Sequence, residues 1–211
     1  MKQFIAITCC LLLTAFISCE NCNTCATMCS CEGRTDISNK VVETIMARRS
    51  IRNYKQIPVS RDTMQQILLC GINAPNGQNK QSWEVRVVDN EVVMKAIMNA
   101  LDEGGKGDLS SCFRGAPVMA FIARDLSYDF SAYDCGLLAQ NMMLSATSMG
   151  VGSICLGSPV RFILDSPNRD KILSMLGFSE GYELSLCVGF GYANETPEAK
   201  PRNVDKVRFV D

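Results

Sequence analysis

The chain contains no histidine among its 211 residues. Catalysis by a Ser–His–Asp triad or a Cys–His pair is therefore excluded, as is zinc or haem ligation through imidazole. The chain also lacks an excess of either charge, since 21 Lys and Arg residues face 22 Asp and Glu residues for a formal net charge of −1. A general nucleic-acid-binding protein carries a strong basic excess, so we expect no nucleic-acid partner.

Apolar runs long enough to span a bilayer are missing as well. The run near the start covers only residues 4–17, whereas a membrane-spanning helix needs about 20 residues. It follows Lys2 and ends at Ser18-Cys19, a pattern that is typical of a secretory leader. A small residue before a cysteine at this point resembles the lipobox of bacterial lipoproteins, in which the leader is cut before a lipid-carrying cysteine.

We therefore expect a signal peptide over residues 1–18, a lipid on Cys19, a Cys-rich tether over 19–36 and a folded domain over 37–211. Such a chain would be a lipid-anchored protein of the cell envelope, in the periplasm or at the outer membrane, and would meet the membrane through its lipid alone. The alternative is an apolar N-terminal helix that stays attached, or a cytoplasmic chain.

Seven of the 12 cysteines lie in the first 31 residues: Cys9, Cys10, Cys19, Cys22, Cys25, Cys29 and Cys31. The spacing from Cys19 to Cys29 is that of a ferredoxin-type cluster half-site. No second motif follows, however, and Cys19 cannot both carry a lipid and ligate iron. Disulfides formed outside the cytoplasm are the other interpretation. Both remain open for Cys22, Cys25, Cys29 and Cys31.

Apolar periodicity and turn residues predict alternating helices and strands in the folded part. Helices are expected at residues 38–50, 60–72, 91–101, 134–149, 161–164 and 168–176. Strands are expected at residues 83–88, 118–123, 151–156 and 184–192. The glycine-containing segment 103–114 should be a mobile loop with Cys112 exposed, and the tail 193–211 should be polar. This order predicts an α+β or α/β domain with a central sheet flanked by helices.

The common phosphate-binding loops are absent. Gly104-Gly105-Lys106-Gly107 lacks the spacing and the Ser or Thr of a P-loop. Gly189-Phe190-Gly191 lacks the third glycine and the following helix of a dinucleotide-binding fingerprint. Any phosphate that this protein holds must therefore be held by side-chain cations.

Three segments supply candidate binding groups. Residues 48–52 place three guanidinium groups and a hydroxyl at a predicted helix end, which suits a phosphate dianion. Residues 74–83 crowd amide side chains before a predicted strand, and amides carry the donors and acceptors that match the edge of a heterocycle. Residues 200–202 add two cations. Each segment alone would equally fit a solvated surface.

Together with the run at 150–157, these segments fall into four ordered motifs. The motifs are Arg-Arg-Ser-Ile-Arg-x-Tyr at 48–54, Ala-Pro-x-x-x-Asn-x-Gln-x-Trp at 74–83, Gly-Val-Gly-Ser-Ile-Cys-Leu-Gly at 150–157 and Gly-Tyr-x-x-Glu-Thr-Pro-x-x-Lys-Pro-Arg at 191–202. In order and spacing they resemble the FMN-dependent nitroreductase family over residues 40–210. Ser82 stands where Pro is usual, and Ala193 stands where Pro often follows Gly-Tyr. The leader is the larger departure, since most relatives are cytoplasmic.

The resemblance implies an α+β fold with a mostly antiparallel central sheet flanked by helices, and an intertwined homodimer with FMN at its interface. By analogy, the flavin phosphate is held by Arg48, Ser50, Lys200 and Arg202. Arg49 is expected to help along the ribityl chain.

The ring of the flavin is expected to meet a second set of residues. The resemblance places Arg52 near the N1/O2 edge and Asn79 on the pyrimidine side. Cys155, Leu156 and Gly157 are expected near N5 and O4, where they would offer backbone N–H groups. Cys155 is interpreted as a small strand residue more than as a redox-active thiol, and Cys70, Cys135 and Cys187 as core residues.

The function implied by the resemblance is an FMN oxidoreductase that moves hydride from NAD(P)H, through flavin N5, to nitroaromatic, quinone or similar electron-poor acceptors. No catalytic side chain and no metal is expected, because the cofactor carries the chemistry and the protein supplies binding and electrostatics. The alternative is an envelope lipoprotein that binds flavin or another ligand without NAD(P)H-dependent turnover, because NAD(P)H is a cytoplasmic reductant.

Overall fold

The computed structural model describes residues 39–105 and 107–210. The predicted signal peptide, the tether and the lipidated Cys19 lie outside the described residues, as do the two alternatives for Cys22, Cys25, Cys29 and Cys31. No helix within the described ranges combines the length and hydrophobicity that a bilayer crossing requires.

Four strands form one antiparallel sheet with the order β1-β2-β4-β3. Their bounds are Trp83–Val88 for β1, Val118–Asp125 for β2, Gly152–Leu156 for β3 and Tyr182–Gly191 for β4. The central strand β2 is buried over its first six residues, which explains why its sequence reads as a continuous apolar run. The predicted antiparallel sheet is confirmed.

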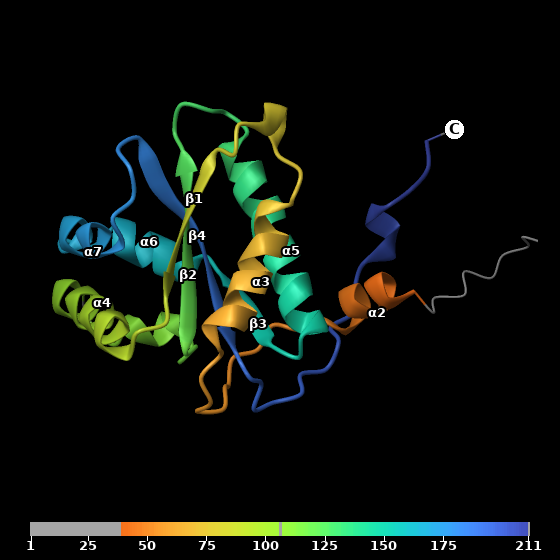
Figure 1. The fold of residues 1–211 in the computed structure, drawn as a ribbon, viewed down its shortest axis with the longest axis horizontal. Coiled ribbons are helices and arrows are strands. Elements are labelled where there is room, and N and C mark those ends of the chain that lie inside the picture. Colours follow the sequence, from red (N-terminus) through yellow and green to blue (C-terminus); the bar gives the residue numbers. More distant parts are fainter. Residues whose placement is uncertain (1–38, 106, 211) are drawn as a thin grey trace, which may run out of the picture. The chain divides into compact units, whose positions relative to one another are not determined.

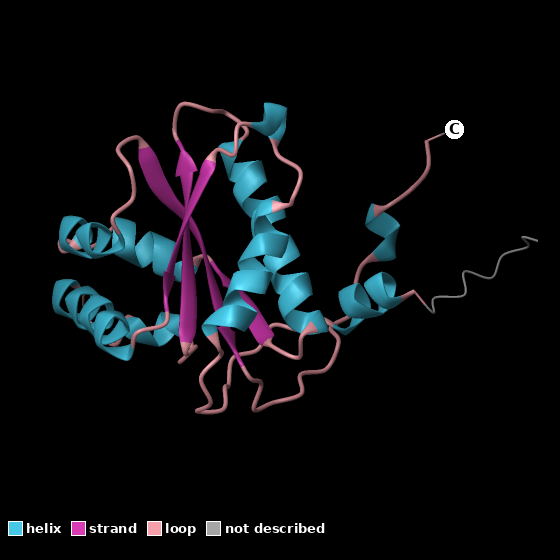
Figure 2. Ribbon diagram, in the orientation of Figure 1, coloured by secondary structure: helices cyan, strands magenta, loops and turns pink. Residues whose placement is uncertain are grey.

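Helices cover both faces of this sheet (Figures 1 and 2). On one face lie α3 (Arg61–Ile72) and α5 (Ser131–Ser148), and on the other lie α4 (Glu91–Gly104), α6 (Ser158–Leu164) and α7 (Arg169–Leu176). Alternation along β2 divides the core accordingly, since Ala120 and Ile122 pack toward α3 and α5 while Met119 and Phe121 pack toward the other three helices. The flanked sheet predicted from the sequence is confirmed.

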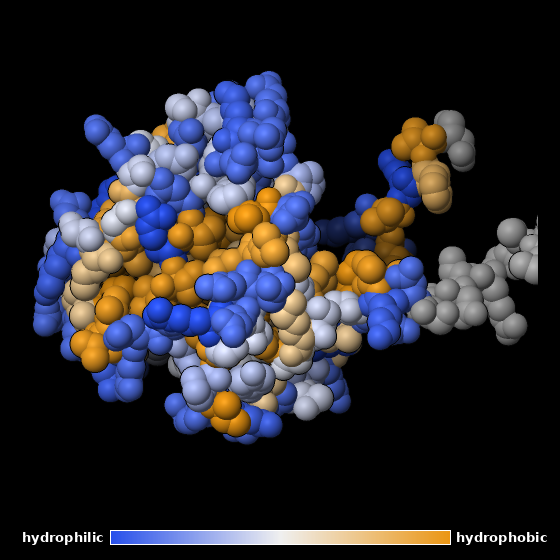
Figure 3. Space-filling model, in the orientation of Figure 1, coloured by the Kyte–Doolittle hydropathy of each residue, from blue (hydrophilic) through white to orange (hydrophobic). Residues whose placement is uncertain are grey.

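Two segments near the ends of the described chain present apolar side chains to solvent. Helix α2 (Lys40–Ala47) buries none of its residues, and Val41 and Met46 are 64% and 66% exposed. The tail ends with Val204, Val207, Phe209 and Val210, which are 75–96% exposed. The tail, predicted to be polar, therefore also exposes apolar side chains near its end. Figure 3 shows apolar surface at both places.

The predicted mobile loop over residues 103–114 is also wrong at both ends. Helix α4 continues to Gly104, and Ser110–Phe113 form a 3₁₀ helix in which Cys112 and Phe113 are buried. Burial raises the pKa of Cys112 to about 12, so its thiol is neither exposed nor acidic. Cys135 and Cys187 are buried as predicted, whereas Cys70 is only half-buried.

Candidate functional site

The basic segment 48–52 lies along the edge of the sheet, beside β3. Helix α2 ends at Ala47, and the N–H of Arg48 still donates to the carbonyl of Thr44 at 3.0 Å. Ser50 then forms a parallel bridge with Ser153, and the N–H of Ile51 donates to the carbonyl of Ser153 at 3.0 Å. The arginines are therefore held on a short extended segment at the sheet edge.

Glycines in the neighbouring strands allow this segment to approach closely. A Cβ atom at Gly152 would lie 2.8 Å from Cγ1 of Ile51, and one at Gly191 would lie 2.7 Å from Cδ1 of Tyr54. Real Cβ atoms do not approach so closely, so both positions require glycine. The Tyr54 hydroxyl donates to the carbonyl of Ile51 at 2.8 Å, and burial raises the pKa of Tyr54, which keeps this donor protonated.

The chain that follows β4 joins the same segment. The carboxylate of Glu195 accepts hydrogen bonds from the backbone N–H groups of Arg52 and Asn53. The N–H of Lys55 donates to the carbonyl of Tyr192 at 2.8 Å, which adds a main-chain link. The beginning of the C-terminal tail therefore lies against the basic segment, although the two are far apart in the sequence.

The candidate cations have no acidic partner within residues 39–105 and 107–210. The five ion pairs found in these ranges are all formed by other side chains. Arg49 donates to the carbonyls of Met46 and Arg48, and Arg202 donates to the carbonyl of Lys200 at 3.1 Å. No hydrogen bond of the described chain connects Arg202 with Arg48, so their predicted convergence stays a prediction. A group of uncompensated cations is suited to an anionic ligand.

The far end of β3 lies within reach of this charge. Cys155, two residues after the bridged Ser153, is exposed to solvent, and the positive charge of Arg48 opposes the rise in its pKa that partial desolvation causes. The side chain of Leu156 is buried, so only its backbone could contact a ligand. A Cβ atom at Gly157 would meet no atom within 4 Å, so space is open beside the strand end. The cations and this space fit a phosphate-bearing planar group.

Asn79 does not join these residues in one copy of the chain. It belongs to the 3₁₀ helix Gly77–Asn79 just before β1, at the end of the sheet where Asp125 pairs with Tyr182. Ser50 lies at the other end, where Ser153 pairs with Phe190. Strand β4 has ten residues, and at about 3.3 Å per residue the two ends are roughly 30 Å apart.

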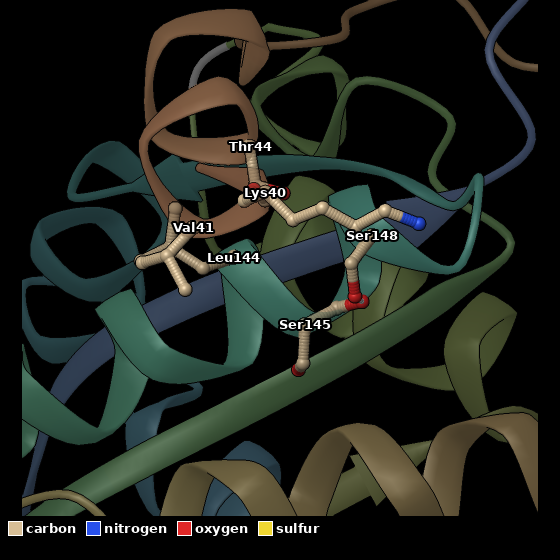
Figure 4. Close-up of a pocket in the computed structure, with 6 residues that line it drawn as sticks. All are labelled: Lys40, Val41, Thr44, Leu144, Ser145 and Ser148. Atoms are coloured by element: carbon tan, nitrogen blue, oxygen red, sulfur yellow. Dashed lines mark hydrogen bonds between the residues drawn. The ribbon is translucent and has the colours of Figure 1, made fainter. Parts of the chain in front are cut away.

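A pocket of about 260 Å³ lies elsewhere, between α2 and α5. Figure 4 shows its lining, which consists of Lys40, Val41, Thr44, Leu144, Ser145 and Ser148. It contains none of the residues predicted to bind flavin. It is bordered by the exposed apolar helix α2, so it belongs with that surface and not with the candidate site.

Three residues that hold the candidate segments in place were not predicted from the sequence. Glu195 is part of a quoted motif, but its role as a backbone acceptor depends on a contact with residues more than a hundred positions away. Ser153 is buried, and its hydroxyl has no partner among the described residues. Asp134 is a buried acid in an apolar helix, and that contrast was a signal that could have been used.

Comparison with known proteins agrees with this arrangement. Residues 45–192 match the sequence model of the Nitroreductase family. An NADPH-flavin oxidoreductase of Vibrio harveyi is 30% identical over 175 residues, which cover 78% of this chain and 70% of the relative. A nitroreductase of Desulfitobacterium hafniense solved with bound FMN has a TM-score of 0.73 at 31% identity, covering 82% of this chain and 99% of that one. A nitroreductase of Bacteroides fragilis, also with bound FMN, has a TM-score of 0.75 at 26% identity, covering 82% and 100%. The match over residues 45–192 and the identity to these relatives show that the chain belongs to the nitroreductase family.

Proposed function

We propose that this protein is an FMN-dependent oxidoreductase that takes hydride from NAD(P)H and delivers it to nitroaromatic, quinone or similar electron-poor acceptors. The observation that carries the proposal is that the basic segment 48–52, whose arginines form no ion pair within the described residues, lies along β3, the strand that leads to the open space at Gly157. Two family members with the same fold and 31% and 26% identity hold FMN, which supports the choice of ligand.

In this proposal the two ends of the chain hold the phosphate. Arg48 and Ser50 come from the edge segment, Lys200 and Arg202 come from the tail, and Arg49 contacts the ribityl chain. Guanidinium groups suit this role because they form paired, charge-assisted hydrogen bonds to phosphate oxygens. The hydrogen bonds to Glu195 hold the beginning of the C-terminal tail against the basic segment 48–52, which supports a shared site.

The ring is assigned to the remaining residues. Arg52 would place a positive charge at the N1/O2 edge, and the backbone of Cys155, Leu156 and Gly157 would offer N–H groups near N5 and O4. When bound, FMN supplies the chemistry of accepting hydride at N5 and passing it on. A fixed cation beside N1 favours a negative charge on that side of the ring, which is the contribution of the protein to reduction.

We also propose that the protein acts as a homodimer in which Asn79 completes the site of the partner subunit. The separation of Asn79 from the arginines within one copy supports this arrangement. The exposed apolar residues of α2 and of the tail end supply surface for such an interface.

Purified protein is expected to be yellow, and its visible absorbance should bleach anaerobically when NADH or NADPH is added. Reoxidation by a nitroaromatic or a quinone should restore the colour. The absorption spectrum, followed in a sealed cuvette, measures both steps. Colourless protein that does not take up added FMN would end the proposal.

The second candidate function is flavin binding in the cell envelope without NAD(P)H-dependent turnover. It is favoured by the apolar run that ends at Ser18-Cys19, because an exported protein would lack its usual reductant. Flavin that binds but stays oxidised with both NADH and NADPH, while a membrane electron carrier reduces it, would favour this candidate.

Location is tested separately. We propose that residues 1–18 are removed and that Cys19 carries a lipid, as its sequence context indicates. The intact mass of protein from its native membrane fraction should correspond to residues 19–211 plus a diacylglycerol. A mass for the whole chain without lipid would contradict the prediction, and anaerobic iron and sulfide analysis decides whether the N-terminal cysteines hold a cluster.

A further inference from the structure

A buried aspartate, Asp134, accepts hydrogen bonds from both ends of the turn over residues 77–82. Asp134, in the first turn of α5, is only 3% exposed and takes part in no ion pair of the described chain. One carboxyl oxygen, Oδ1, accepts from the N–H of Gly77 at 3.0 Å. The other, Oδ2, accepts from the hydroxyl of Ser82 at 2.7 Å. One side chain therefore holds both ends of the turn that contains Asn79.

The turn between these two contacts has an unfavourable backbone. The φ angles of Gln78, Asn79 and Gln81 are 55°, 55° and 50°. These angles lie in the left-handed region, which residues other than glycine rarely adopt. Such conformations persist only where the surrounding structure imposes them, and they concentrate at functional sites. The Asp134 contacts supply that constraint at Gly77 and Ser82.

Further packing closes the same turn. The N–H of Gln81 donates to Oδ1 of Asn76 at 2.9 Å, and a Cβ atom at Gly77 would lie 1.9 Å from the Tyr128 hydroxyl oxygen. By contrast, Asn79 is exposed, and its side chain makes no hydrogen bond within the described residues. The turn is thus held rigidly while the Asn79 amide remains available to a ligand.

We propose that Asp134 is a positioning residue for the flavin ring: through Gly77 and Ser82 it fixes the turn that presents Asn79. The inference rests on the proposed function, because it needs Asn79 to meet the ring. A carboxylate suits the role because both its oxygens accept and neither needs a donor of its own. Its place at the N-terminus of α5 adds the favourable field of the helix dipole.

The first test is Ser82→Ala, which removes one of the two contacts and little volume. We expect binding of FMN and of riboflavin, which lacks the phosphate, to weaken alike by about ten-fold, the usual effect of one lost buried hydrogen bond. At saturating FMN, the midpoint potential of the bound flavin should also shift, because Asn79 is no longer held against the ring. Binding is measured by fluorescence titration, and the potential by dye-equilibrated reduction.

Ser110→Ala is the matched control, since the Ser110 hydroxyl also donates to an aspartate, Asp108, at 3.0 Å on the other side of the sheet. It should change neither flavin affinity nor potential. A Ser82→Ala variant with wild-type affinity and potential would overturn the inference while leaving the proposed function intact. Wild-type protein that binds no flavin would instead sink the proposed function.

Asp134 itself is tested by a pair of variants. Asp134→Ala should weaken both ligands more than Ser82→Ala does, whereas Asp134→Asn should recover much of the loss because its amide oxygen can still accept from Gly77. Equal losses in the two variants would argue against positioning through these hydrogen bonds. Should Asp134→Ala fail to fold, Ser82→Ala and Asp134→Asn still decide the question.

Discussion

Arg202→Ala is expected to weaken FMN binding about 100-fold and to leave riboflavin binding within about two-fold of the wild type. A charge-assisted hydrogen bond from a guanidinium group to a phosphate contributes about 1.5–3 kcal/mol, which corresponds to about one to two orders of magnitude in affinity. Riboflavin lacks the phosphate, so it should not be affected. Fluorescence titration of each flavin with apoprotein measures both constants.

Arg208→Ala provides the control for that experiment. Arg208 lies in the same exposed tail, has the same charge and is not assigned to the site. It should leave both affinities unchanged. Equal weakening of FMN and riboflavin by Arg202→Ala would show that the side chain does not hold the phosphate, and an unchanged FMN constant would remove Arg202 from the site.

Gly157→Val should weaken flavin binding strongly without destabilising the apoprotein. The added side chain would enter the open space beside the end of β3, where no protein atom lies within 4 Å of the Cβ position. The φ of −94° at this position is accessible to any residue, so no backbone strain is introduced. Overpacking against the bound ring should weaken FMN about 10- to 100-fold.

The melting temperature of the apoprotein and the titration with FMN together check this expectation. Gly136→Val is the counterpart, because Gly136 also has no atom within 4 Å of its Cβ position but lies on α5, away from β3. It should bind FMN as the wild type does. Normal FMN affinity in Gly157→Val would mean that the ring lies elsewhere.

Local sequence patterns predicted most of the fold. The apolar run at 118–123 places Val118, Ala120 and Ile122 on one face and Met119 and Phe121 on the other, and it forms the buried central strand β2. Ser60 begins α3 as a hydroxyl N-cap, in keeping with its position before an apolar periodic run. The prediction for residues 103–114 was wrong because their glycines are typical of a loop. In the structure, Cys112 and Phe113 are buried in the core, where their 3₁₀ helix contacts α4 and α6.

The candidate site was predicted less completely, because its geometry depends on long-range contacts. The segment 48–52 does lie beside β3, through the bridge between Ser50 and Ser153, while the convergence of its arginines with residues 155–157 stays a prediction. The hydrogen bonds of Glu195 to residues 52 and 53 could not be predicted from sequence spacing, because no local pattern pairs a carboxylate with backbone N–H groups of a distant segment. The position of Asn79 at the opposite end of the sheet required the strand register.

The attachment of residues 52 and 53 to Glu195 has a consequence for biosynthesis. These partners are 143 and 142 positions apart, so this contact cannot form until the ribosome has made nearly the whole chain. Contacts this distant in sequence form late and slowly. In the proposed function, in which Lys200 and Arg202 also hold the phosphate, we therefore expect FMN to bind only after synthesis, and nascent chains stalled before Glu195 should bind none.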